Sequence, residues 1–171
     1  MSAVRVRSAT LDDVASIADV HQAAILELGS EVYDEEQVRA WIANVHPERY
    51  PIDDRENGIH IVVAEREADD RVVGFGWLDR DSSDRPESTG EVVAVYVHPE
   101  HTREGVGSTV LDRLEAVARD EGLEELVLAA SKNAIDFYRR RGYEADETVA
   151  LDMTDEVSLE ALRMRKRLAS E

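Results

Sequence analysis

Two glycines, Gly105 and Gly107, lie one residue apart where an apolar run gives way to an amphipathic one, in the stretch HPEHTREGVGS (residues 98–108). If this stretch turns into a helix, its first backbone N–H groups lack partners inside the helix, and the helix dipole adds positive charge there. Glycine leaves room for a bulky anion. Arg103 adds a charge and Ser108 a hydroxyl. The stretch therefore predicts a phosphate or pyrophosphate cradle, made by Arg103, Glu104, Gly105, Val106, Gly107 and Ser108.

The same two glycines also fit a plain turn, because turns use glycine freely. Two known glycine fingerprints are absent. No GK[ST] follows, as a P-loop requires, and Val110 stands where the dinucleotide motif GxGxxG has its third glycine.

Hydrophobic periodicity predicts the elements that position this stretch. Strands are expected at 4–7, 59–65, 72–79, 91–98, 126–130, 143–151 and 159–166. Helices are expected at 10–28 (ended by Gly29), 34–43, 106–121 (stopped by Gly122) and 134–141 (closed by Gly142). Segments 46–58 and 81–90 are expected to be loops. The order β-α-α-β-β-β-α-β-α-β-β predicts an α+β fold: a mixed, mostly antiparallel central sheet of about seven strands flanked by helices.

Length and composition set broad limits. The chain has 171 residues, 43% of them hydrophobic, which predicts a single globular domain over residues 1–171. No apolar run is long enough to span a membrane, and the first residues lack a signal-peptide core, so a cytoplasmic protein is expected. The absence of cysteine excludes disulfides and thiolate chemistry. The five histidines show no metal spacing, so no metal is expected.

Charge is the unusual feature of the composition. Acidic residues number 38 against 20 basic ones, a net charge of −18, and Lys132 and Lys166 are the only lysines. This charge argues against nucleic acid and anionic membranes as partners. Because the acids are spread along the whole chain, they indicate no particular substrate. Dispersed acidity with few lysines resembles proteins of salt-loving microbes, and a halophilic origin is expected.

Several motifs, in order, resemble the GNAT superfamily of acetyl-CoA-dependent N-acetyltransferases. The family signature is a strand, a proline-containing turn, [QR]xxGx[GA] and a long helix, and this chain has YVHPEHTREGVGSTVLDRL. RVRSATLDDVASIADVH resembles the opening strand and helix of the family, VVGFGWL its third strand, and SKNAIDFYRRRGYE its late helix. Thr102 departs from the expected Gln or Arg. In the late motif, Ser131 stands where the family has an asparagine, and the asparagine of this chain, Asn133, lies two places nearer to Tyr138.

The resemblance implies where acetyl-CoA binds. The diphosphate would lie on residues 103–108, and the pantetheine arm would bond to the backbone of Val95, Tyr96 and Val97 like an added strand. Either Ser131 or Asn133 would contact the cofactor, and one of the arginines at 139–141 could meet its 3′-phosphate.

The resemblance also implies the catalytic groups. Tyr138 would donate a proton to the leaving thiolate, because a phenol pKa near 10 keeps it protonated at neutral pH. Glu91 is the candidate base. The alternative is that Glu91 is simply one of the many acidic residues exposed to solvent. Phe137 is interpreted as part of an apolar stripe. Trp41 and Trp77 are expected in the core, although Tyr33, Trp41, His46 and Tyr50 lie in the segment that shapes the acceptor pocket in this family.

The expected function is transfer of an acetyl group to a primary amine by direct attack in a ternary complex. The alternative is a non-catalytic acyl-CoA-binding or regulatory module on the same fold. The acceptor stays open among an amino acid, a polyamine, an antibiotic and a protein N-terminus. A homodimer is possible, since dimers are common in the family.

Overall fold

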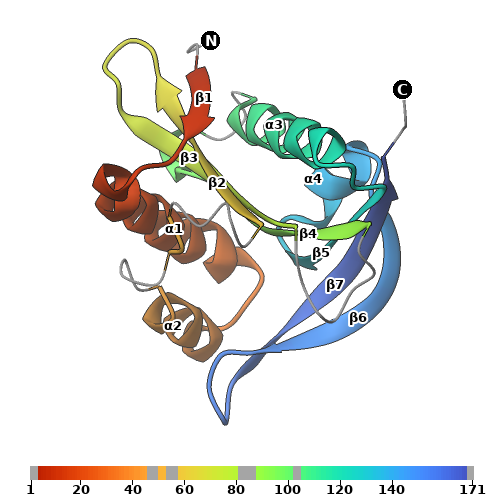
Figure 1. The fold of residues 1–171 in the computed structure, drawn as a ribbon. Coiled ribbons are helices and arrows are strands. Elements are labelled where there is room, and N and C mark those ends of the chain that lie inside the picture. Colours follow the sequence, from red (N-terminus) through yellow and green to blue (C-terminus); the bar gives the residue numbers. More distant parts are fainter. Residues whose placement is uncertain (1–3, 46–49, 53–57, 81–87, 102–104, 169–171) are drawn as a thin grey trace.

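The computed structural model describes residues 4–45, 50–52, 58–80, 88–101 and 105–168. Within these ranges, the strands form a seven-stranded sheet in the order β1-β2-β3-β4-β5-β7-β6 (Figure 1). All neighbouring strands are antiparallel except the parallel pair β4 and β5. The elements are β1 (Val4–Ser8), α1 (Val14–Leu28), α2 (Glu35–Ala43), β2 (Ile59–Arg66), β3 (Val72–Asp79), β4 (Thr89–Val97), α3 (Val106–Asp120), β5 (Glu125–Ser131), α4 (Ile135–Arg140), β6 (Glu144–Asp152) and β7 (Ser158–Arg167).

The predicted fold class and element order are confirmed, with one local difference at the start of β4. Gly29 ends α1 as predicted: it is the C-cap, with φ −67°, and a 3₁₀ turn, Gly29–Glu31, follows. Its small size also matters, since a Cβ there would lie 3.1 Å from the Trp41 ring. Strand β4 begins at Thr89, inside the predicted loop, because Thr89 and Gly90 pair with the start of β5. Gly122 and Gly142 do close their helices with positive φ.

Helices cover both faces of the sheet and enclose two separate apolar cores. Figure 1 shows α1 and α2 on one side of the sheet and α3 and α4 on the other. The core under α3 includes Val110, Leu111, Leu114, Leu126 and Met164. The core under α1 and α2 is rich in aromatic rings and includes Ile17, Ile25, Tyr33, Trp41 and Phe75. The helices on each side therefore bury their apolar stripes against their own face of the sheet.

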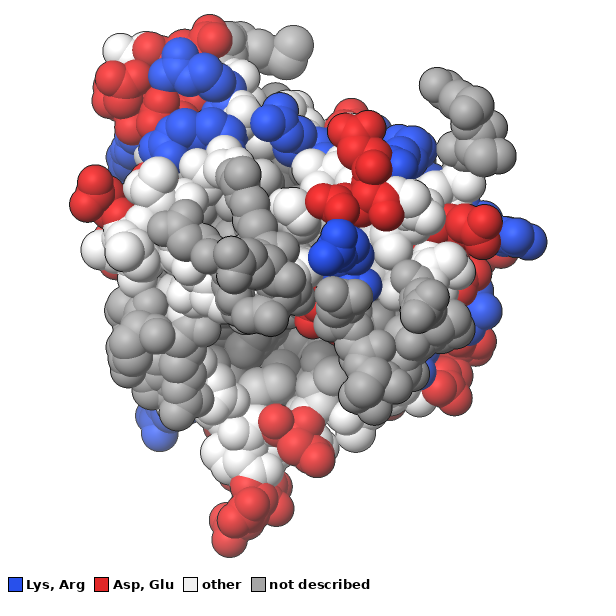
Figure 2. All heavy atoms as spheres, in the orientation of Figure 1, with Lys and Arg blue, Asp and Glu red and all other residues white. Residues whose placement is uncertain are grey.

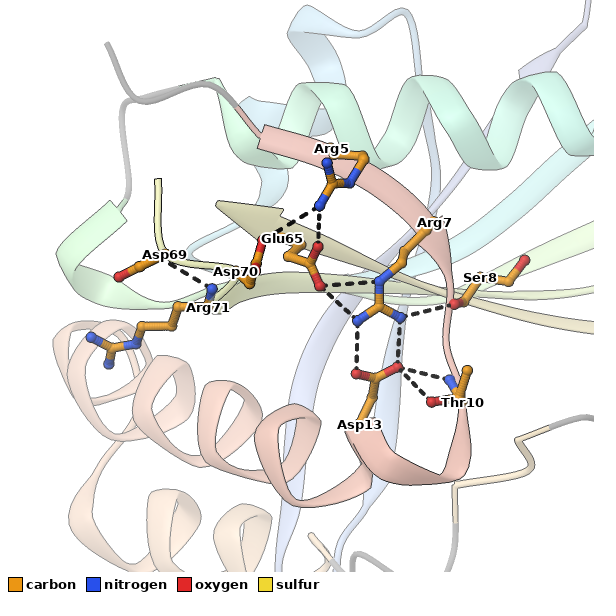
Figure 3. A network of polar contacts seen from close by, with 9 residues as sticks. All are labelled: Arg5, Arg7, Ser8, Thr10, Asp13, Glu65, Asp69, Asp70 and Arg71. Carbon is orange, nitrogen blue, oxygen red and sulfur yellow. Dashed lines mark hydrogen bonds and ion pairs between the residues drawn. The ribbon is translucent and has the colours of Figure 1, made fainter. Parts of the chain in front are cut away.

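A polar network ties the first strand to the rest of the sheet (Figure 3). The guanidinium of Arg7 donates to both carboxylate oxygens of Asp13, at 2.8 and 3.0 Å, and to Glu65 on β2 at 2.8 Å. Asp13 also accepts the backbone N–H of Thr10 at 2.8 Å, which caps the turn before α1. The network fixes the angle at which the chain leaves β1 and enters α1.

Charged side chains of both signs gather along the upper and right-hand sides of the face shown in Figure 2. Figure 2 shows acidic and basic groups mixed along the upper edge of this face, and acidic groups at the bottom, where Figure 1 places the turn between β6 and β7. No helix in the described part of the chain is long and apolar enough to cross a membrane.

Candidate active site

The sheet opens between its two parallel strands. Pairing between β4 and β5 covers only Thr89 with Glu125, Gly90 with Leu126 and Glu91 with Val127. Beyond Glu91, β4 stays paired with β3 as far as Val97, while β5 stays paired with β7 as far as Ser131. The two strands therefore diverge from a closed end at Glu91.

A β-bulge accompanies this opening. Trp77 on β3 pairs with Ala94 and Leu78 pairs with Val92, so Val93 is an extra residue on β4 without a partner in that ladder. A bulge bends its strand and increases the local twist. Its position, two residues after the last β4–β5 pair, accounts for the divergence of β4 from β5.

The backbone of β4 presents polar groups to the opening. The N–H of His98 donates to the carbonyl of Val73 on β3 at 2.8 Å. Because backbone groups in an antiparallel pair alternate between the two sides of a strand, those of Tyr96 also face β3. The N–H and C=O groups of Val95 and Val97 therefore point toward the opening on the β5 side. Of the three positions predicted to bond the pantetheine arm, two direct their backbone there.

A cavity of about 660 Å³ occupies the opening. Residues from both cores line this cavity, so it passes through the sheet and does not lie on one face alone. From the core under α3 it takes Val95, Val97, Val106, Phe137 and Tyr138. From the aromatic core it takes Trp41, Trp77, Tyr96, Leu151 and Leu159. We call the first the α3 end of the cavity and the second the α1 end.

The predicted anion cradle lies at the α3 end. Gly105 is the N-cap of α3 with φ +84°, and Gly105, Val106, Gly107 and Ser108 all line the cavity. The first turn of α3 carries no acidic side chain. The hydrogen bonds within the helix begin at Thr109, whose N–H donates to the carbonyl of Gly105. The amides of Val106, Gly107 and Ser108 precede the first N–H bonded within the helix, which is the arrangement an anion site at a helix start uses. Arg103 and Glu104, also predicted here, lie outside the described residues.

Phe137, which the sequence indicates only as part of an apolar stripe, lines the cavity. A Cβ on Gly107 would lie 3.3 Å from the Phe137 ring. The glycine therefore allows α3 and α4 to approach each other at the cavity wall. The late motif contributes Ser131 and Asn133 as well: both line the cavity, and the Ser131 hydroxyl donates to the Asn133 side-chain oxygen at 2.9 Å.

Tyr138, the candidate acid, lies on α4 at the cavity wall and is only 6% exposed. Burial raises the pKa of its phenol above the usual value near 10, which keeps the hydroxyl protonated at neutral pH. Its ring meets that of Tyr143 edge-on, with centroids 5.6 Å apart. The backbone N–H of Tyr143 donates to the carbonyl of Tyr138 at 3.0 Å. The residue is thus held at both its ring and its backbone.

Glu91, the candidate base, lines the same cavity at its closed end. Its backbone pairs with Val127 on β5 and Asp79 on β3. The structure therefore brings both candidate catalytic side chains, Tyr138 and Glu91, to one cavity together with the β4 edge and the start of α3. Arg140, one of the arginines considered for the 3′-phosphate, lines it as well.

Sequence reasoning gave no role to His21, which lines the α1 end of the cavity. Its Nδ1 lies 2.9 Å from the Tyr50 hydroxyl, and its ring lies 4.4 Å from that of Tyr96. Burial lowers the pKa of His21 to about 4, so the ring is neutral at pH 7. Only packing brings α1 beside β4, and no local spacing indicates this contact. His46 lies outside the described residues.

Of the residues in the segment expected to shape the acceptor pocket, Trp41 lines the cavity and Tyr33 is not among its lining residues. The Tyr33 hydroxyl donates to the carbonyl of Glu160 at 2.6 Å and accepts the N–H of Lys132 at 3.1 Å, so it joins the segment between α1 and α2 to β7 and to the end of β5. Trp41 and Trp77 pack in the aromatic core as expected, and both also form cavity wall. In the described part of the chain, no group of three or more potential metal ligands comes together.

Comparisons with known proteins agree with this architecture. A family model described as "Acetyltransferase (GNAT) family" matches residues 23–143. A spermidine N(1)-acetyltransferase of Thermoplasma acidophilum is 20% identical over 92% of this chain and 99% of its own length.

Two solved structures share the fold over nearly the whole chain. A GCN5-related N-acetyltransferase from Rhodopseudomonas palustris is 28% identical, with a TM-score of 0.81 over 98% of both chains. The PaiA N-acetyltransferase of Thermoplasma acidophilum, solved in complex with coenzyme A, is 21% identical, with a TM-score of 0.74 over 96% of this chain and 99% of that one. The family match, together with the open sheet and its cavity, identifies this chain as an acyltransferase of the GNAT acetyltransferase family.

Proposed function

We propose that this enzyme transfers the acetyl group of acetyl-CoA to a primary amine, with both substrates bound at once and no acyl-enzyme. One observation carries the proposal: a single cavity crosses the sheet between β4 and β5 and is lined from both faces. Two substrates can therefore enter from opposite faces and meet at the opening. Bound coenzyme A in the PaiA relative supports the choice of cofactor.

The α3 end of the cavity fits acetyl-CoA. A strand edge with the backbone of Val95 and Val97 directed outward suits the amide-bearing pantetheine arm, which binds as an extra strand does. The helix start at Gly105–Ser108 suits the diphosphate. Ser131 and Asn133 lie on the opposite wall, on the β5 side, and offer further polar contacts. The thioester supplies an activated acetyl group.

Tyr138 is assigned the role of general acid. As the amine nitrogen bonds to the thioester carbonyl carbon and the C–S bond breaks, the phenol gives its proton to the departing sulfur, which leaves as a thiol. A thiol has a pKa near 8.5, so protonation by an undissociated phenol prevents the thiolate from attacking the new amide. The phenol then regains a proton from solvent.

Glu91 is assigned the role of base for the acceptor. Deprotonating an amine of pKa about 10.4 at pH 7 costs about 4.6 kcal/mol, against about 1 kcal/mol for an α-amino group. A carboxylate at the closed end of the cavity lowers this barrier by accepting the proton, directly or through water. Its importance is therefore expected to grow with the basicity of the acceptor.

The decisive experiment is Tyr138→Phe, which removes the proton and keeps the ring. The variant is expected to lose about 10²–10⁴-fold in kcat, the range typical of general acid–base catalysis, while its Kd for acetyl-CoA by calorimetry is unchanged. Phe137→Leu is the neighbouring control, because Phe137 has no proton to give. Full turnover by Tyr138→Phe contradicts the assignment, and acetyl-CoA binding without turnover of any amine favours a non-catalytic acyl-CoA sensor.

A further inference from the structure

The wall of the α1 end of the cavity indicates which amines this site accepts. We infer that the acceptor is a primary amine with an apolar body, such as an alkyl or aryl chain, and not a polyamine that carries further charges. The inference rests on the proposed function, because it takes the α1 end as the acceptor chamber.

The described residues of the chamber wall are almost all apolar or aromatic. α1 contributes Ala24 and α2 contributes Trp41. β3 and β4 contribute Trp77 and Tyr96, and Met153 and Leu159 reach in from the β6–β7 hairpin. The indole of Trp41 meets the Tyr96 ring edge-on, with centroids 6.3 Å apart. Flat, rigid rings in this arrangement offer a large apolar area to a ligand.

Two histidines, His21 and His101, line the cavity, and His21 on α1 adds no charge to this end. The His21 ring is wedged against Tyr96 and Phe75, with centroid distances of 4.4 and 5.5 Å, and its Nδ1 is engaged with Tyr50. Burial keeps the ring neutral at pH 7. His21 therefore offers a hydrogen-bonding ring nitrogen and no charge.

The balance of energies decides against a second ammonium group. An aromatic wall attracts a cation, but only weakly. Removing an ammonium from water costs more free energy than this attraction returns, even after the protein relaxes. Among the described lining residues the only carboxylate is Glu91, at the closed end of the β4–β5 opening, and the proposed function already assigns it to the reacting amine, so none is left for a second ammonium group. A methyl group in the same place gains free energy on leaving water instead.

A matched pair of amines tests the inference. Pentylamine and butane-1,4-diamine have the same number of heavy atoms and differ in a terminal CH₃ against NH₃⁺. Thiol release from acetyl-CoA is followed for each in molar KCl, where the large negative charge of the protein no longer concentrates cations at its surface. Pentylamine is expected to be used at least tenfold more efficiently than the diamine, as measured by kcat/KM. Equal or better use of the diamine overturns the inference.

A variant pair locates the preference in the chamber. Met153 is half-buried at the end of the hairpin, with the Asn44 side chain donating to its backbone carbonyl at 3.0 Å, so a polar side chain of similar length is tolerated there. Met153→Glu adds a counter-ion, and Met153→Gln is the uncharged control of the same size. Relative to the control, Met153→Glu is expected to shift the kcat/KM ratio at least tenfold toward the diamine. An unchanged ratio overturns the assignment of this end as the acceptor chamber.

Failure of this inference can be told apart from failure of the proposed function. If calorimetry shows acetyl-CoA bound and a broader panel of polyamines is acetylated while apolar amines are not, the acceptor class is wrong and the enzyme assignment stands. If acetyl-CoA does not bind, the proposed function fails first.

Discussion

The Tyr143 hydroxyl donates a hydrogen bond to the Glu115 carboxylate, 3.0 Å away, inside the core under α3. Glu115 is 3% exposed, and its other oxygen accepts a hydrogen bond from the Lys166 ammonium at 2.9 Å. Lys166 also donates to the backbone carbonyl of Arg141, the C-cap of α4, at 2.8 Å. One buried carboxylate on α3 thus links β7 to the end of the helix that carries Tyr138.

Lys166→Met is expected to lower the free energy of unfolding by about 3 kcal/mol, because it leaves the buried Glu115 carboxylate without its closest counter-charge. The other lysine of the chain provides a matched control. Lys132 pairs with Glu160 at 3.7 Å on the surface, with side chains 41% and 65% exposed, so Lys132→Met should cost about 0–1 kcal/mol. Urea unfolding in molar KCl measures both. Equal losses contradict the importance assigned to Glu115.

Gly105 and Gly122 form a second matched pair. Both have positive φ, +84° and +81°, and no described atom lies within 4 Å of a Cβ built at either position. Replacement by alanine should therefore cost about 1 kcal/mol of unfolding free energy at each site through backbone strain. Only Gly105 lines the cavity, so only Gly105→Ala is expected to raise the Kd for acetyl-CoA, which calorimetry measures. An equal Kd in the two variants argues against a diphosphate at the start of α3.

Arg7→Met should make unfolding less sensitive to acid. The Arg7 guanidinium lowers the pKa of Asp13 in the folded protein. A carboxyl whose folded pKa is depressed stabilises the fold above its unfolded pKa of about 3.9, and this contribution disappears as pH falls through the folded value. We expect Arg7→Met to cost about 1–3 kcal/mol at pH 7.

The difference between the two proteins should shrink steadily below about pH 4 and vanish once Asp13 and Glu65, the two carboxylates bonded to Arg7, are protonated in both. Thermal unfolding across this range checks the sign. A gap that is the same at pH 3 and pH 7 would show that Arg7 acts through packing of its side chain rather than through its charge.

Salt is expected to stabilise this fold strongly, in line with the proposed halophilic origin. The net charge of −18 repels itself over a screening length of about 10 Å at 0.1 M salt but only about 3 Å at 1 M. The urea midpoint should therefore rise between these two KCl concentrations. An uncharged solute at equal osmolality is the control, and it should raise the midpoint less because it does not screen charge. No rise with KCl would show that the dispersed acids are neutral to stability.

The order of the elements and the faces of the helices were predictable because both depend on local periodicity. The stripe of Val110, Leu111 and Leu114 appears in the sequence as plainly as in the core. Motif spacing likewise indicated Tyr138 and the stretch around Gly105, and the structure places both at the cavity. Their catalytic and binding roles stay predictions.

Apart from Trp41, the wall at the α1 end of the cavity was beyond sequence reasoning because it forms only when distant segments pack together. His21, Trp77 and Met153 come from three segments with no shared sequence pattern, and nothing in its own segment marks any of them as a cavity residue. The cavity contact of Phe137 was equally hidden, because a local apolar stripe cannot reveal that one of its members borders a cavity. The early start of β4 at Thr89 depends on pairing with β5, which is also non-local.

The extra residue in β4 has a consequence for how this strand tolerates change in length. Val92, Val95 and Val97 share one face of the sheet and Ala94 and Tyr96 the other, an arrangement that strict alternation forbids unless Val93 is skipped. Losing that single codon would leave Ala94, Val95, Tyr96 and Val97 on their present faces but would remove the bulge, and with it the bend that turns β4 away from β5 and opens the cavity. Insertions and deletions here are therefore far more damaging than substitutions, and homologues should keep the length of this strand even where its side chains change.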